Sequence, residues 1–162
     1  MKHTGIVNGP AGVTDQVIAY GSQLLEAGPW CLRPCLKGER ALMVTIFIVD
    51  DEAILHRLYK DVFAIKGHQV VADAYDGEEA VRKFTEMNPR PDVIILDHRM
   101  PNKDGLEAMK EILNIERGAR IVFISADANV REQAIKNGAA SFGLKPVTIR
   151  HMLDLVESAV NP

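Results

Sequence analysis

The chain has 162 residues and a formal net charge of −3 at pH 7, a length that fits one domain with an additional segment. The near-balanced charge argues against a nucleic-acid binder that works by neutralising phosphates, so we expect no direct DNA binding. No apolar run approaches the roughly 20 residues of a membrane helix, and the first residues do not resemble a signal peptide. The sequence therefore predicts a cytoplasmic protein without membrane attachment.

Residues 1–42 differ in composition from the rest of the chain. They are rich in glycine and proline and show one weak helical pattern, over residues 15–27. They also hold both cysteines, Cys31 and Cys35, which are too few for a zinc site and leave the remainder without a disulfide. We expect a poorly ordered N-terminal extension. The alternative is a start-site artefact, because a strand pattern begins directly after Met43 as it would at a natural N-terminus.

Apolar runs alternate with helical patterns along residues 43–162. The first run, residues 44–49, has the continuous apolar character of a strand that is buried on both faces. Helical spacing of apolar residues follows over residues 53–65, and Gly67 marks the end of that helix. The later elements are expected as strands at 68–72, 93–96, 121–124 and 140–144 and as helices at 76–87, 104–115, 129–137 and 147–160. Capping signals open three of these helices: Asp76 with Glu79, Asp104 with Glu107, and Asn129 with Glu132.

Five β-α units of this length imply a parallel sheet with helices on both faces. In such α/β domains, ligands bind beyond the carboxyl ends of the strands. The sequence therefore predicts an α/β domain over residues 43–162 and places its site among the residues that follow the strands.

Polar residues stand at these strand ends. Asp50 and Asp51 follow the first predicted strand, Asp97 the third, Ser125 the fourth and Lys145 the fifth. Two carboxylates about 4 Å apart repel by roughly 4 kcal/mol at an effective dielectric constant near 20. A hard cation with oxygen ligands removes this repulsion and prepares the site for a phosphoryl group, so we expect Mg²⁺.

Each of these residues also has a purely structural interpretation. Asp50 or Asp51 could cap the following helix, and Ser125 could bond to nearby backbone. Their occurrence together at one sheet edge favours chemistry instead. A carboxylate such as Asp97 can attack a phosphoryl donor and form an acyl phosphate, and a lysine such as Lys145 is a compact positive charge for phosphate oxygens.

The segment Asp97-His98-Arg99-Met100-Pro101-Asn102-Lys103-Asp104-Gly105 has the form D-x-x-M-P-x-x-D-G. With the paired acids, the serine and the Lys145-Pro146 dipeptide, it makes residues 43–160 resemble the receiver domain of response regulators. These are the phospho-acceptors of two-component systems, here most similar in form to a single-domain chemotaxis regulator. The resemblance implies a doubly wound, flavodoxin-like (βα)5 sheet with strand order 2-1-3-4-5.

The resemblance also implies roles for single residues. Asp97 is then the phosphorylation site and receives its phosphoryl group from a sensor histidine kinase or a histidine phosphotransfer protein. Asp51, Asp97 and the backbone carbonyl of Arg99 hold Mg²⁺, and Asp50 acts through a metal-bound water. The remaining implied roles are phosphate binding by Ser125 and Lys145, an aromatic switch at Phe142, a backbone turn at Gly105 and a cis peptide before Pro146. The family's phosphohistidine lies on the partner kinase, so no catalytic role is expected for His98.

Signalling is expected through a surface formed by the segments 129–137, 140–144 and 147–160. The last predicted helix lies directly before Pro162, so we expect this domain to bind a downstream protein target or to pass the phosphoryl group on. Substrate turnover as an enzyme is not expected, and phosphorylation-dependent homodimerisation stays open.

Two further questions stay open. Arg99 and Asp127 have opposite charges and could pair across the mouth of the site, which would slow attack by water, but Asp127 could equally cap a helix. The alternatives for the whole domain are a degenerate receiver that only binds other proteins, and a magnesium-dependent phosphatase with an aspartyl nucleophile. Such phosphatases typically have a second acid two residues after the nucleophile, where this chain has Arg99.

Overall fold

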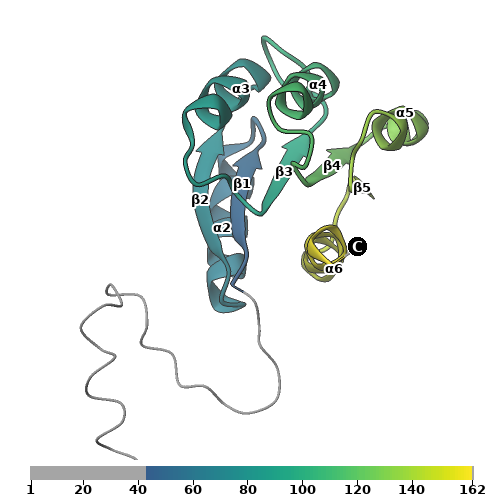
Figure 1. The fold of residues 1–162 in the computed structure, drawn as a ribbon. Helices are drawn as coiled ribbons and strands as arrows, with labels where there is room; N and C mark the ends of the chain where they lie inside the picture. The colour runs from purple at the N-terminus through teal and green to yellow at the C-terminus, as the bar shows by residue number, and fades with distance from the viewer. Residues whose placement is uncertain (1–42, 162) are drawn as a thin grey trace, which may run out of the picture. The chain divides into compact units, whose positions relative to one another are not determined.

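The computed structural model describes residues 43–161, which contain one parallel β-sheet of five strands. The strands lie in the order β2-β1-β3-β4-β5, as Figure 1 shows. Their bounds are β1 (Thr45–Val49), β2 (Gln69–Ala74), β3 (Val93–Asp97), β4 (Ile121–Ser125) and β5 (Ser141–Leu144). The predicted fold class and strand order are confirmed.

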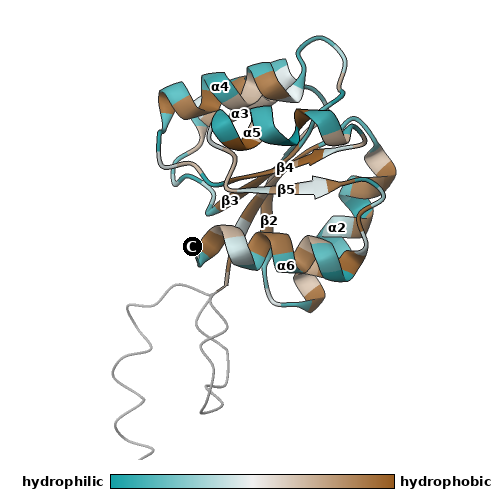
Figure 2. Cartoon of the chain, turned by 90° about the vertical axis from the view of Figure 1, so that its right-hand side faces the viewer, coloured by the Kyte–Doolittle hydropathy of each residue, from teal (hydrophilic) through white to brown (hydrophobic). Residues whose placement is uncertain are grey.

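Helices cover both faces of the sheet. They are α2 (Ala53–Ile65), α3 (Gly77–Glu86), α4 (Gly105–Ile115), α5 (Arg131–Lys136) and α6 (Ile149–Val160), with a 3₁₀ turn, η1 (Ala128–Val130), before α5. Helices α3, α4 and α5 lie on one face, and α2 and α6 lie on the other (Figure 1). Figure 2 shows the apolar sides of the helices turned toward the sheet. Both faces of the central strands are therefore shielded from water.

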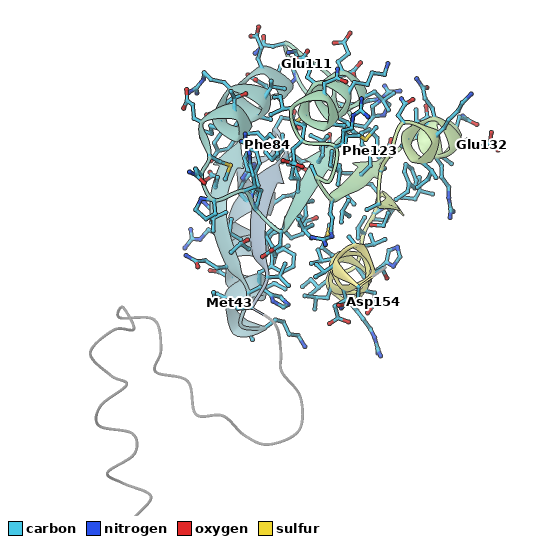
Figure 3. The ribbon with its side chains drawn as sticks, viewed as in Figure 1. Met43, Phe84, Glu111, Phe123, Glu132 and Asp154 are labelled. Atoms are coloured by element: carbon cyan, nitrogen blue, oxygen red, sulfur yellow. The ribbon has the colours of Figure 1, made fainter. Side chains whose placement is uncertain are left out.

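Each face of the sheet has its own hydrophobic core. Phe47, Phe84 and Phe123 are fully buried in the core under α3, α4 and α5. Figure 3 shows Phe84 and Phe123 inside the domain, whereas Glu111, Glu132 and Asp154 point away from it. The second core includes Phe63 of α2 and Met152 of α6. Burying one such side chain contributes about 1.5–3 kcal/mol, so the helices hold the strand ends in fixed positions.

Local signals explain most helix boundaries. Helix α2 has the predicted bounds, and Gly67 follows it with a φ of 82°, a conformation that favours glycine. The side chain of Asp76 accepts a hydrogen bond from the Glu79 amide at the start of α3. Asp104 accepts one from the Glu107 amide at the start of α4 in the same way. Both predicted N-caps are confirmed.

Three predicted boundaries are wrong by two residues, and several others differ by one. Asn129 lies inside η1 and does not cap a helix, because the Asp127 side chain accepts the hydrogen bond from the Asn129 amide and opens this turn. Helix α6 begins at Ile149 rather than at residue 147, since Thr148 caps it by accepting from the His151 amide. Strand β2 extends to Ala74 because its pairing with β1 continues to the end of that strand.

The predicted N-terminal extension, residues 1–42 with Cys31 and Cys35, lies outside the described residues. Within residues 43–161, no helix is long and apolar enough to cross a membrane.

Candidate functional site

Four of the predicted site residues meet at the carboxyl edge of the sheet. Asp97 and Ser125 are the last residues of β3 and β4, while Asp50 and Lys145 directly follow β1 and β5. The Nζ atom of Lys145 lies 2.7 Å from Oδ1 of Asp97 and 3.2 Å from Oδ2 of Asp50. Residues that are up to 95 positions apart in the chain therefore form one charged cluster.

The two carboxylates of this cluster are buried. Asp50 and Asp97 are each only 4% exposed. Burial raises the pKa of the Asp97 carboxyl above its ordinary value, although the hydrogen bond from Lys145 opposes this shift. Burial alone would lower the pKa of the Lys145 ammonium, but its hydrogen bond and attraction to Asp97, with the charge of Asp50, raise it. Lys145 therefore stays charged at neutral pH and partly balances two negative groups.

Backbone amides hold both carboxylates in place. The amide of Arg99 donates to Oδ2 of Asp97 over 2.9 Å, so Oδ1 is left to face Lys145. The amide of Glu52 donates to Oδ1 of Asp50, also over 2.9 Å. Since each carboxylate has one oxygen on the backbone and one on the lysine, the orientation of both groups is fixed.

Gly105 lets the loop after β3 return close to Asp97. Its amide donates to the carbonyl oxygen of His98 over 2.8 Å. A Cβ atom at this position would overlap the backbone carbonyl oxygen of Asp97. The position therefore excludes any side chain, and the predicted backbone role of Gly105 has a steric reason.

Ser125 is fully buried and lies between two neighbours. Its Oγ atom is 3.0 Å from Nδ1 of His98 and accepts a hydrogen bond of 2.9 Å from the Asp127 amide. Its carbonyl oxygen accepts from the Lys145 amide over 2.8 Å. The sequence places His98 beside Asp97 but does not predict its contact with Ser125, because the two residues are 27 positions apart and no spacing rule connects them.

A second histidine was also missed by the sequence analysis. His56 on α2 is only 2% exposed, and its Nε2 atom lies 2.6 Å from the backbone oxygen of Asp50. Its other ring nitrogen is 3.8 Å from Asp73, and its ring lies 4.5 Å from that of Tyr75. The signal that could have found it is its helical position, six residues after Asp50 on the buried side of α2.

Two further predicted site residues are Phe142 of β5 and Pro146, which follows Lys145. The peptide between Lys145 and Pro146 is cis, as predicted. Phe142 is half-buried, and its ring stacks on Phe123 at a centroid distance of 6.4 Å. The guanidinium of Arg131 lies 6.0 Å from the same ring. Phe142 thus has the packing role of an aromatic strand residue, and its predicted switching role stays a prediction.

The predicted metal ligands supply only oxygen atoms, which suits a hard cation such as Mg²⁺. Asp51 is exposed directly after the buried Asp50, and the backbone of Arg99 lies against the Asp97 carboxylate. Two buried carboxylates face one ammonium, so the site keeps negative charge that a cation would balance. Within residues 43–161, no group of three or more His, Cys, Asp or Glu side chains is gathered closely enough to hold a metal ion. The donor set fits Mg²⁺, and the ligand roles stay predictions.

Comparisons with known proteins agree with this geometry. The chemotaxis protein CheY of Bacillus subtilis is 37% identical over 118 residues, which cover 72% of this chain and 97% of that protein. CheY of Thermotoga maritima is 40% identical over 104 residues, or 62% of this chain and 84% of that one. A solved structure, the CheX-CheY-BeF3-Mg complex from Borrelia burgdorferi, contains a chain that is 31% identical to this one and superposes with a TM-score of 0.68. The match covers 71% of this chain and 87% of that chain.

The family model of the response regulator receiver domain matches residues 46–157. This range begins within β1, covers the other four strands and includes every site residue named above. CheY-like receiver domains are signalling proteins rather than enzymes that turn over a substrate. The fold, the acid–lysine cluster at the sheet edge and this match agree, and the chain belongs to the response regulator receiver domain family.

Proposed function

We propose that this chain is a response regulator that accepts a phosphoryl group on Asp97 from a phosphohistidine of a partner protein. The observation that carries this proposal is the ion pair of 2.7 Å between Lys145 and the Asp97 carboxylate at the end of β3. It combines a carboxylate nucleophile with a cation that can pair with an incoming phosphoryl oxygen.

The transfer exchanges one bond for another. An oxygen of Asp97 forms a bond to phosphorus, and the bond between phosphorus and the imidazole nitrogen of the donor breaks. The electron pair of the broken bond stays on that nitrogen. Lys145 is already oriented toward Asp97, so it can follow the charge from the carboxylate to a phosphoryl oxygen.

Mg²⁺ bound by Asp51, Asp97 and the Arg99 carbonyl would supply charge neutralisation for the transferring group. The negative charge left on the acid pair by a single ammonium supports this assignment. Asp51→Asn should weaken Mg²⁺ binding by about tenfold or more, since losing even an outer partner of a metal site costs that much. Glu52→Gln, a neighbouring exposed acid, is the matched control and should bind Mg²⁺ like the wild type.

The signal would leave the domain through α5, β5 and α6. Ser125 and Lys145 are predicted to donate to phosphoryl oxygens, and the Lys145 amide is bonded to the Ser125 carbonyl. A shift of one is thereby coupled to the other and to β5, which biases the surface that a downstream protein would bind.

Acetyl phosphate with Mg²⁺ tests the acceptor directly. The wild type should gain one phosphoryl group by intact mass, and Asp97→Asn should gain none. Asp104→Asn is the control, because it changes an acid in the same loop and asparagine also caps helices well. Full labelling of the Asp97→Asn variant would overturn the assignment of the acceptor.

This experiment and a second assay, with a small phosphate ester, separate the two rival functions. A degenerate receiver that only binds other proteins would take up no phosphoryl group from acetyl phosphate. A phosphatase would release phosphate continuously from an excess of a small phosphate ester, whereas a response regulator would label once and lose the group slowly.

A further inference from the structure

The buried hydroxyl of Ser125 has two polar neighbours in the structure. The Asp127 amide lies 2.9 Å from Oγ and can only donate, so it uses an oxygen lone pair. Nδ1 of His98 lies 3.0 Å from the same oxygen. His98 is held there by its ring contact with Phe123, at a centroid distance of 5.7 Å.

These contacts determine where the hydroxyl hydrogen points. A serine hydroxyl has one hydrogen to donate, and Ser125 is 0% exposed, so bulk water cannot accept it. Among the hydrogen bonds of residues 43–161, His98 Nδ1 is the single group beside Oγ that can accept. Donation to His98 Nδ1 satisfies this hydrogen and requires that the ring carries its own hydrogen on Nε2.

We propose that His98 is a positioning residue that holds Ser125 in the unphosphorylated conformation. This inference rests on the proposed phosphorylation of Asp97. A phosphoryl group there needs the same single hydrogen of Ser125, so the hydroxyl must leave His98 before it can donate to a phosphoryl oxygen. His98 thereby stabilises the unphosphorylated conformation relative to the activated one. The free energy of its hydrogen bond to Ser125 must be overcome when the phosphoryl group shifts this equilibrium.

The expected effect has the size of one buried neutral hydrogen bond, which corresponds to about a two- to tenfold change in an equilibrium constant. His98→Phe keeps a ring against Phe123 and removes the acceptor, so the free form loses its hydrogen bond. Its apparent affinity for beryllium trifluoride with Mg²⁺, a phosphoryl mimic, should rise by that factor. His98→Asn keeps an acceptor one bond beyond Cγ, near the position of Nδ1, and should remain close to the wild type.

Ser125→Ala provides the test of the contact itself. In that background, His98→Phe should no longer change the affinity, because the hydroxyl that His98 holds is gone. An equal gain with and without Ser125 would overturn the proposal, as would an unchanged or lower affinity in His98→Phe alone.

A measurement on the wild type does not depend on how the variants fold. Long-range ¹H–¹⁵N spectra should show the free protein with the His98 hydrogen on Nε2 and a changed Nδ1 shift after addition of beryllium trifluoride and Mg²⁺. A hydrogen on Nδ1 in the free protein would overturn the proposal. If the wild type binds no mimic and takes up no phosphoryl group, the proposed function fails; if it does both and these His98 results are absent, only this inference fails.

Discussion

The guanidinium of Arg99 lies 3.9 Å from the carboxylate of Asp127, and these residues follow the ends of the neighbouring strands β3 and β4. Oδ1 of Asp127 also accepts a hydrogen bond of 2.9 Å from the Asn129 amide. The two interpretations of Asp127 are therefore compatible, since one oxygen caps η1 and the other faces Arg99. The pair stands two residues beyond Asp97 and Ser125, where we predict that water approaches a phosphoryl group on Asp97.

Arg99→Ala should shorten the lifetime of the phosphoryl group on Asp97 by up to about fivefold, because an exposed pair is worth about 0–1 kcal/mol. The side chain of Arg99 is 76% exposed, so the melting temperature should stay nearly unchanged. Arg57→Ala, on the exposed side of α2, is the control for losing one positive charge. Decay of the labelled protein followed by intact mass checks this, and an unaltered or slower rate in Arg99→Ala would contradict it.

Gly105→Ala should destabilise the domain by about 1–3 kcal/mol, the usual range for an overpacked core position. The added methyl group meets the Asp97 carbonyl oxygen, which belongs to the central strand and cannot yield easily. In Gly118→Ala, the methyl group would lie 3.4 Å from a flexible glutamate side chain, so this variant should unfold like the wild type. Urea unfolding of the three proteins measures the difference. Equal stability of all three would show that the loop relaxes around residue 105.

Asp97→Asn should make the metal-free protein more stable at neutral pH. Burial raises the pKa of Asp97 above the value near 3.8 of an unfolded chain, so the folded state binds the proton more strongly. The free energy of unfolding therefore falls as the pH rises from the pKa of Asp97 in the unfolded chain through its higher pKa in the folded protein. Asparagine does not ionise, so the variant does not lose this stability. Thermal unfolding with a chelator should show the gain at pH 7 and a smaller gain below about pH 4. A gain that is equal at both pH values would point to another cause.

A chain that begins at Met43 should fold and accept a phosphoryl group as the full chain does. Both hydrophobic cores of the described residues are formed between Val44 and Val160, and the family match begins at residue 46. The melting temperature should change by less than the few degrees that correspond to about 1 kcal/mol. A larger loss would mean that residues 1–42 contribute to the stability of the receiver domain.

The sequence predicted the elements better than their arrangement. Helix α2 was predicted with its observed bounds, because its apolar positions and Gly67 are both local signals. The strand order came from family resemblance, since hydrophobic periodicity shows that strands are buried and does not show which of them are neighbours. The helix start predicted at Asn129 was wrong because Asp127 and Asn129 are equally good caps by type. The structure uses Asp127 to open η1, and α5 begins at Arg131 without a side-chain cap. The Asp127 amide is fixed by Ser125, which brings the aspartate into place.

The site was predictable where chemistry needs a residue at a strand end. Asp50, Asp97, Ser125 and Lys145 all lie at the predicted edge of the sheet. His98 and His56 were missed because their roles depend on contacts across the fold, with Ser125 Oγ and with the Asp50 carbonyl. For His98, no sequence pattern separates such a contact from an ordinary half-buried position, whereas the helical position of His56 indicates at least its burial.

The strand order also determines which part of the site can move. Strand β3 is buried along its whole length and has a hydrogen-bonded neighbour on each side, so Asp97 stands on a rigid support. Within residues 43–161, strand β5 is paired on one side only, and Lys145 follows it directly. When the charge at Asp97 changes, we expect Lys145 and β5 to move more than Asp97 does. For the proposed phosphorylation signal, this asymmetry favours one direction, outward through β5 toward α6.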